Sequence, residues 1–299
     1  MENNLTARTS GPADHPRPRQ MRRSFRRGTA LLPSLFTVAN LGMGWYALQQ
    51  TCLALQSLGG RAAADRLDLA AKAIGWAILL DGMDGRIARL TGSSSAFGRE
   101  FDSLADVISF GVAPALLGFI WGLRFLTLQP RLGIPLNHAG ELIAFLFVVA
   151  CAARLARFNL SGPEASPSNP GRPDRKYFVG MPAPAAAGLV AAVVHFFASP
   201  HFLFNDPNQS LTGALLWLAL LLAISYLMVS RWRFFSFKDI DLRRRRRWVT
   251  TVAVGLLLAG IWYFSEVLLL LLAVVYVGTA IYWRLEHRLR RRPSRGESQ

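Results

Sequence analysis

Charged residues and cysteines are scarce in this sequence of 299 residues. Only 17% of the residues are charged while 52% are hydrophobic, a balance that excludes an ordinary water-soluble protein. Its two cysteines, Cys52 and Cys151, lie in apolar segments, so we expect neither a disulfide framework nor a metal-binding role for them. Several apolar runs of about 20 residues instead predict a polytopic membrane protein.

Acidic residues are also few, 18 against 34 Lys and Arg, which gives a net charge of +16. Nucleic-acid binding could explain such an excess, but the basic residues gather in tails and loops that border apolar runs. This distribution favours cytoplasmic topology signals and contacts with anionic membrane lipids, and we expect no nucleic-acid partner. About eight spans with both termini in the cytoplasm satisfy the pattern of basic segments, which fall at 1–28, 86–99, 154–176, 231–247 and 284–295.

The predicted fold is an all-α polytopic transmembrane helix bundle, and no stretch is left for an independent soluble domain. The first 28 residues have no apolar core of the kind that a signal peptide has. The last apolar stretch is too long for one span and is interrupted around Tyr263 to Glu266, so we interpret it as two spans. We therefore expect a disordered basic cytoplasmic arm at 1–28, a six-span catalytic bundle at 29–230, a polybasic cytoplasmic segment at 231–249, a transmembrane hairpin at 250–284 and a basic cytoplasmic tail at 285–299.

Four aspartates interrupt otherwise apolar sequence between residues 81 and 106. In a helix, one face carries the first two aspartates and three neighbours, namely Asp81, Asp84, Gly85, Ala88 and Arg89. A second helix carries Gly98, Asp102 and Asp106 on one face, because they repeat every four residues. A short Gly- and Ser-rich loop joins the two helices as antiparallel neighbours, so the two carboxylate faces can meet.

Converging carboxylates repel one another and take up protons unless cations neutralise them. Oxygen ligands without a nearby His or Cys favour Mg²⁺, Mn²⁺ or Ca²⁺ over zinc. Four carboxylates suffice for two divalent ions about 3.5–4 Å apart, the arrangement that supports phosphoryl displacement. Gly85 and Gly98 leave room for close helix or nucleotide approach, and Arg89 can meet a phosphate or balance the acidic cluster.

The string DxxDGxxAR, followed after eight residues by GxxxDxxxD, resembles the signature of the CDP-alcohol phosphatidyltransferases. The resemblance implies a two-metal site, with Mg²⁺ or Mn²⁺, that moves a phosphatidyl group from a CDP-linked donor to an alcohol and releases CMP. It implies Asp81, Asp84, Asp102 and Asp106 as metal ligands, with Asp106 also the general base. It further implies a homodimer, and CDP contacts from Gly85, Ala88, Arg89 and Gly98.

Further patterns are similar to the phosphatidylserine synthase branch of that family. PxLFTxxNLxxG in the first span contains Asn40, for which the resemblance implies a role near the nucleotide. RFN, with Arg157 and Asn159 at the inner end of the fourth span, could bind the carboxylate and ammonium of serine. Nearby Arg154 is either a flanking topology charge or a ligand.

These resemblances imply transfer from CDP-diacylglycerol to L-serine, in the bacterial inner cell membrane with the active site facing the cytoplasm. The alternative is the same chemistry on glycerol 3-phosphate, inositol phosphate or choline, since a phosphate-bearing acceptor could recruit Arg154, Arg157, Arg175 and Lys176. An ion-coupled transporter would also bind cations through aspartates, but it predicts two repeated halves, and the sequence contains no such repeat.

Overall fold

The computed structural model describes residues 19–57, 60–91, 96–123, 130–160, 177–199, 211–235 and 247–290. These residues are helical apart from two short strands and a few turns, which confirms the helical fold class for the part of the chain described. The elements are α1 (Arg19–Gln56), α2 (Gly60–Thr91), α3 (Ala96–Asp106), the π-helix η1 (Val107–Val112), α4 (Ala113–Leu123), α5 (Pro130–Leu160), β1 (Tyr177–Val179), α6 (Ala183–Ala198), α7 (Leu211–Val229), β2 (Arg233–Phe235) and α8 (Arg247–Arg290).

Helix α1 begins earlier than the sequence suggested. Residues 1–18 of the expected disordered arm lie outside the described residues, whereas residues 19–28 of that arm form the first turns of α1. Residues 19–23 are all Arg, Gln or Met, which favour the helical conformation, so the helix can begin there. The predicted polybasic segment at 231–249 and the basic tail at 285–299 lie largely outside the described residues.

Four stretches are long and apolar enough to cross a membrane, namely Phe97–Leu123, Leu136–Leu160, Leu211–Val229 and Ala259–Tyr282. The first of these consists of α3, η1 and α4 together, and α6 is a shorter apolar helix. Charged residues interrupt α1 and α2, which pack against the apolar helices. The protein is therefore a membrane protein, and the predicted total of about eight spans stays a prediction.

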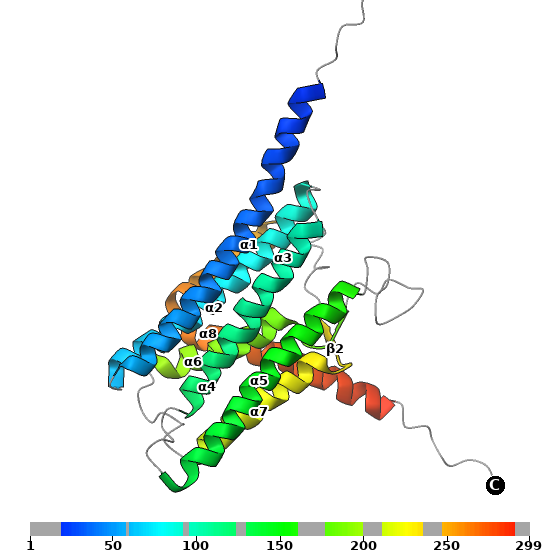
Figure 1. The fold of residues 1–299 in the computed structure, drawn as a ribbon. Coiled ribbons are helices and arrows are strands. Elements are labelled where there is room, and N and C mark those ends of the chain that lie inside the picture. Colours follow the sequence, from blue (N-terminus) through cyan, green and yellow to red (C-terminus); the bar gives the residue numbers. More distant parts are fainter. Residues whose placement is uncertain are drawn as a thin grey trace, which may run out of the picture.

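The helices pack as a bundle in which α1 lies along α2, and α2 also contacts α6 (Figure 1). Buried alanines line both members of the first pair, including Ala47 and Ala54 on α1 and Ala70 and Ala77 on α2. Such small side chains allow membrane helices to approach closely. Helix α5 packs on α7 and on η1, so the segment that follows α3 is enclosed between α1 and α5.

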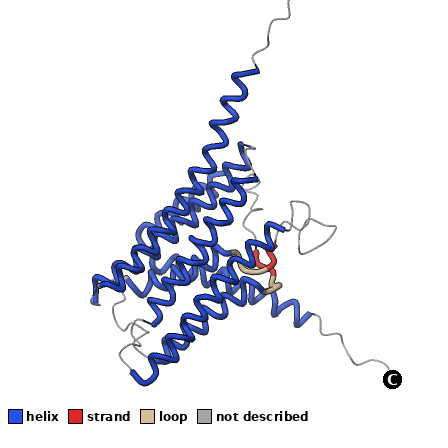
Figure 2. The backbone as a smooth tube through the Cα atoms, in the orientation of Figure 1, coloured by secondary structure: helices blue, strands red, loops and turns tan. Residues whose placement is uncertain are grey.

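A two-stranded sheet lies at the edge of the bundle, where Figure 2 draws the strands in red. β1 pairs antiparallel with β2, and the amide of Gly180 donates to the carbonyl of Trp232 at 2.8 Å. Gly180 has φ +81°, and a Cβ there would lie 2.5 Å from the carbonyl oxygen of Met228. Only glycine fits this turn without strain. The sheet thereby joins the start of α6 to the end of α7.

Helix α8 is interrupted at Phe264, whose φ of −134° and ψ of 39° are not helical. The interruption falls within the stretch 263–266 where the sequence predicted it. A Cβ added to Gly260 would lie 2.9 Å from Cδ2 of Leu268, although eight residues of straight helix span about 12 Å along the axis. Helix α8 is therefore bent sharply there. That its arms form a hairpin of two membrane spans stays a prediction.

Ser265 and Glu266, which follow this bend, form hydrogen bonds with the C-terminal part of α6 and with Ser199 just after it. His195 lies 2.9 Å from Oγ of Ser265 through its Nε2 and also contacts Asp68 of α2, while the hydroxyl of Ser199 donates to Glu266. These contacts tie the bend to the end of the bundle at which α2 begins. These polar side chains within apolar helices thus form hydrogen bonds with one another.

This arrangement predicts on which side of the membrane each end of the bundle lies. Arg61 and Glu100 are both exposed, at the start of α2 and just past its far end. In intact cells of a Cys52→Ser background, an impermeant thiol reagent should label Arg61→Cys but not Glu100→Cys. Permeabilised cells should label both. Labelling of Glu100→Cys in intact cells would contradict a cytoplasmic position for that end.

Candidate active site

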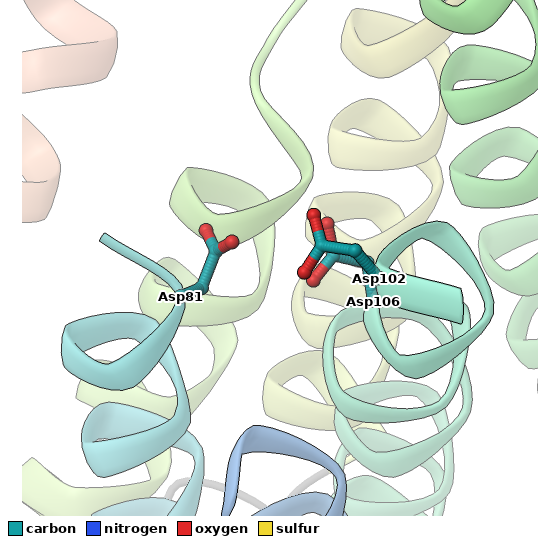
Figure 3. A group of neighbouring side chains, drawn as sticks. All are labelled: Asp81, Asp102 and Asp106. Atoms are coloured by element: carbon teal, nitrogen blue, oxygen red, sulfur yellow. The ribbon is translucent and has the colours of Figure 1, made fainter. Parts of the chain in front are cut away.

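Three aspartates from two neighbouring helices converge in the bundle. Asp81 comes from α2, and Asp102 and Asp106 come from successive turns of α3. Each offers a carboxylate oxygen, and these oxygens lie within 4.8 Å of one another. In Figure 3 the Asp81 carboxylate faces the other two across the gap between the helices. The antiparallel meeting of two carboxylate faces, predicted from the motif spacing, is thus present.

Helix α1 contacts both carboxylate-bearing helices. Asn40 donates from Nδ2 to Oδ1 of Asp106 at 3.1 Å, and the hydroxyl of Thr37 donates to Oδ2 of Asp84. Thr37 and Asn40 are three residues apart and therefore share one face of α1. Both are almost completely buried. A single polar face of α1 thus orients one carboxylate on each neighbouring helix.

Asp84 differs from the three converging aspartates, although the motif predicted all four as metal ligands. Its carboxylate is buried and bonded to Thr37, and it is not part of the group whose oxygens lie within 4.8 Å. It follows Asp81 by three residues on the same face of α2, so it lies next to the group. The Thr37 hydroxyl explains the difference, because it binds the Asp84 carboxylate to α1.

The three converging carboxylates suit a divalent cation. Oδ1 of Asp102 is buried without a hydrogen-bond partner among the described residues, and a buried acceptor of this kind is costly unless something binds it. The group consists of oxygen donors alone, the ligand type that Mg²⁺ and Mn²⁺ prefer. A cation there would also relieve the mutual repulsion of the carboxylates. The residues present therefore fit a hard metal ion.

The remaining predicted nucleotide contacts lie on the same helix faces. Gly85 follows Asp81 by one turn of α2 and is exposed, and Gly98 precedes Asp102 by one turn of α3 and is half-buried. Ala88 and Arg89 continue the helical face of α2, but their side chains lie outside the described residues. The structure thus puts both glycines beside the carboxylates, and their contact with a nucleotide stays a prediction.

The polar residues at the end of α5 are an exposed asparagine and two half-buried arginines. Asn159 is exposed and donates to Oγ of Ser103 at 2.9 Å, beside Asp102. Arg157 reaches the carbonyl of Val229 at the end of α7, at 3.5 Å. Nε of Arg154 is buried without a hydrogen-bond partner among the described residues. Arg154 and Arg157 are both half-buried, so burial does not separate a ligand role from a topology role for Arg154, and both interpretations stay open.

Sequence reasoning missed two of these contacts. The sequence patterns assign no role to Thr37, yet its hydroxyl donates to the motif aspartate Asp84. The available signal was its spacing of three residues from Asn40 within the apolar part of α1. Ser103 was not singled out, because a serine beside a motif aspartate carries no signal of its own before the partner Asn159 is known.

Comparisons with known proteins agree with the motif. The profile of a family described as CDP-alcohol phosphatidyltransferase matches residues 30–225. A Helicobacter pylori protein named CDP-diacylglycerol–serine O-phosphatidyltransferase is 34% identical over 210 residues, which cover 70% of this chain and 74% of that protein. Proteins of the same name from Mycobacterium leprae and Saccharomyces cerevisiae are 38% and 39% identical, over 56% and 38% of this chain and 49% and 37% of theirs.

The metal assignment predicts opposite effects of Asp102→Asn with and without Mn²⁺. Without metal, the variant should unfold at a higher temperature than the wild type, because one repelling charge is gone. With Mn²⁺ at a hundred times its dissociation constant, the wild type should gain about 2.7 kcal/mol and the variant much less. Asp65→Asn, an exposed change near the start of α2, should behave as the wild type. Equal Mn²⁺ stabilisation of both proteins, measured by thermal unfolding in detergent, would exclude this site.

Proposed function

The chain belongs to the CDP-alcohol phosphatidyltransferase family, and we propose that it transfers the phosphatidyl group of CDP-diacylglycerol to the hydroxyl of L-serine, releasing CMP. The relatives named for this reaction support the choice of donor and acceptor. The observation that carries the proposal is the convergence of Asp81, Asp102 and Asp106. Phosphoryl transfer needs positioning and electrostatic stabilisation more than covalent chemistry, and such a cluster can provide both.

The proposed cofactors are two divalent cations, Mg²⁺ or Mn²⁺. Asp81, Asp102 and Asp106 would hold them together with Asp84, whose carboxylate lies beside the group. When bound, the cations would neutralise the donor's diphosphate and the leaving CMP. Asp84 would join through the oxygen that Thr37 does not bind.

Asp106 is the proposed general base. It is 8% exposed, and Asn40 donates to one of its carboxylate oxygens. In the proposed reaction, Asp106 takes the proton of the serine hydroxyl as the serine oxygen attacks the phosphorus that carries the diacylglycerol group. The bond from that phosphorus to the bridging oxygen breaks, and this oxygen leaves with CMP. Asn40 keeps the base oriented. We therefore propose this role for Asn40 in addition to the nucleotide contact that the sequence predicted.

Acceptor recognition is proposed to lie at the end of α5. The serine carboxylate needs a cation, and Arg154 and Arg157 both come from that end of the helix. Nε of Arg154 is buried, and Asn159 donates to Ser103, the residue that follows Asp102. An acceptor phosphate would use the same arginines, so glycerol 3-phosphate and inositol phosphate remain the competing acceptors.

The proposed setting is the bacterial inner cell membrane, with about eight spans, both termini in the cytoplasm and the carboxylate site open to that side. The excess of Lys and Arg around the helix ends near the site supports this orientation. Anionic lipids are proposed to contact the basic segments, and removal of anionic lipid from reconstituted vesicles should then reduce activity. The proposed homodimer would be contradicted by a monomeric mass in detergent.

The function is tested by incubating purified protein with CDP-diacylglycerol and L-serine and measuring CMP and phosphatidylserine. Asp106→Asn keeps the size of the side chain but cannot accept the proton, so we expect turnover to fall by about 10³-fold or more. Chelation should abolish wild-type activity, and Mg²⁺ or Mn²⁺ should restore it. Asp65→Asn serves again as the control. Near wild-type turnover of Asp106→Asn at normal expression would rule out the proposed base.

Acceptor choice gives a separate prediction. Ethanolamine lacks the carboxylate of serine and would leave the arginines at the end of α5 unpaired, so it should be used much less efficiently than serine. Arg157→Lys keeps the charge but loses the planar fork, so it should raise KM for serine more than KM for CDP-diacylglycerol. If only the KM for CDP-diacylglycerol rises, Arg157 belongs to the donor site. If glycerol 3-phosphate outcompetes serine, the serine assignment is wrong.

A further inference from the structure

A π-helix directly follows Asp106. In η1 the amide of Ala113 bonds to the carbonyl of Ile108, five residues earlier, and Ser109, Phe110 and Gly111 are buried. Single π turns within α-helices are rare and are frequent at functional sites. Because η1 packs on α1 and on α5, its contacts with these helices indicate the role of the π turn.

Ser109 contacts α1 at one narrow place. Its hydroxyl donates to the backbone carbonyl oxygen of Asn40 at 3.1 Å. In an α-helix that carbonyl also accepts from the amide four residues later, which belongs to Gly44. A Cβ on Gly44 would lie 2.4 Å from Oγ and 2.9 Å from Cα of Ser109. The close approach of α1 and η1 therefore requires glycine at this position.

The side chain of Asn40 closes a ring of contacts with the same segment. Its Nδ2 donates to Oδ1 of Asp106, and Asp106 and Ser109 are three residues apart in one continuous helix. Asn40 is thus bound twice, through its backbone carbonyl by Ser109 and through its amide to Asp106. Asn40 and Ser109 have no exposed surface. Little water competes for these hydrogen bonds, so they fix the orientation of their members strongly.

We propose that Ser109 is a positioning residue that orients the Asp106 carboxylate through Asn40, and that Gly44 permits the contact. The proposal rests on the proposed function, in which Asp106 takes the proton of the serine hydroxyl. A displacement of about 1 Å at a reacting group can cost on the order of 100-fold in rate. Ser109 acts on the orientation of Asp106 and not on substrate affinity, so its loss affects turnover and metal affinity rather than KM.

The first test is Ser109→Ala, which removes the hydroxyl without adding volume. Loss of a side chain that orients a metal ligand typically costs about 10–100-fold in activity or metal affinity. We expect kcat to fall by about 10-fold or more with both KM values within about twofold. The Mn²⁺ dissociation constant, measured by paramagnetic resonance of unbound Mn²⁺, should rise by about 10-fold. A wild-type kcat and Mn²⁺ affinity, or a change in KM alone, would overturn the proposal.

A double-mutant cycle separates positioning from a general packing role. If Ser109 acts through Asn40, then Ser109→Ala should lower kcat by less than about twofold in an Asn40→Ala background. A packing defect would lower kcat by the same factor in both backgrounds, and that result would refute the route through Asn40. Thermal unfolding of each variant in detergent identifies any that are misfolded. If an Asn40→Ala variant is misfolded, the Mn²⁺ affinity of Ser109→Ala alone tests the positioning role.

Two glycines one half-turn apart on α1 provide a matched pair of substitutions. Gly44→Ala forces α1 away from η1 and should lower kcat by about 100-fold, whereas a Cβ on Gly42 meets nothing within 4 Å and Gly42→Ala should keep wild-type kcat. Equal activity of the two variants would contradict the proposal. If the wild type makes no phosphatidylserine while Ser109→Ala still weakens Mn²⁺ binding, the proposed function fails and the positioning role stands.

Discussion

The repulsion among carboxylates at a partly buried point of an apolar bundle is the constraint on which the rest of the structure depends. Asp81, Asp102 and Asp106 offer oxygens within 4.8 Å of one another, and one buried oxygen of Asp102 has no partner among the described residues. Such a group is stable only if cations neutralise it or protons bind it. Contacts between helices keep the group in place despite the repulsion. A bound metal relieves the repulsion and therefore stabilises the folded protein.

Helix α1 supplies much of that support without contributing a carboxylate of its own. Thr37 binds Asp84, Asn40 binds Asp106, and the carbonyl of Asn40 receives the Ser109 hydroxyl from η1. The absence of a side chain at Gly44 brings α1 close enough for these bonds. The polar residues of α1 therefore orient the carboxylates together, and the π turn after Asp106 belongs to the same hydrogen-bond network.

The sequence was sufficient for the acidic motif, its antiparallel helices, their membrane setting and the interruption near Phe264, because residue spacing determines helix faces and uniform apolar runs indicate spans. It could not reveal that Thr37 binds Asp84, since the two residues lie 47 positions apart and only packing unites them. The π turn could not be predicted either, because the sequence of residues 107–112 is typical of an ordinary apolar α-helix. The short sheet and the early start of α1 were missed for similar reasons, as three-residue strands and a basic helical turn have little sequence signal.

Anomalous X-ray diffraction at the manganese edge, from crystals grown with Mn²⁺ and CDP, tests the central claim most directly. The account predicts two peaks about 3.5–4 Å apart between α2 and α3, within ligand distance of Asp81, Asp102 and Asp106, with Asp84 reaching one of them. Strong peaks elsewhere in the protein, with none among these carboxylates, would contradict it.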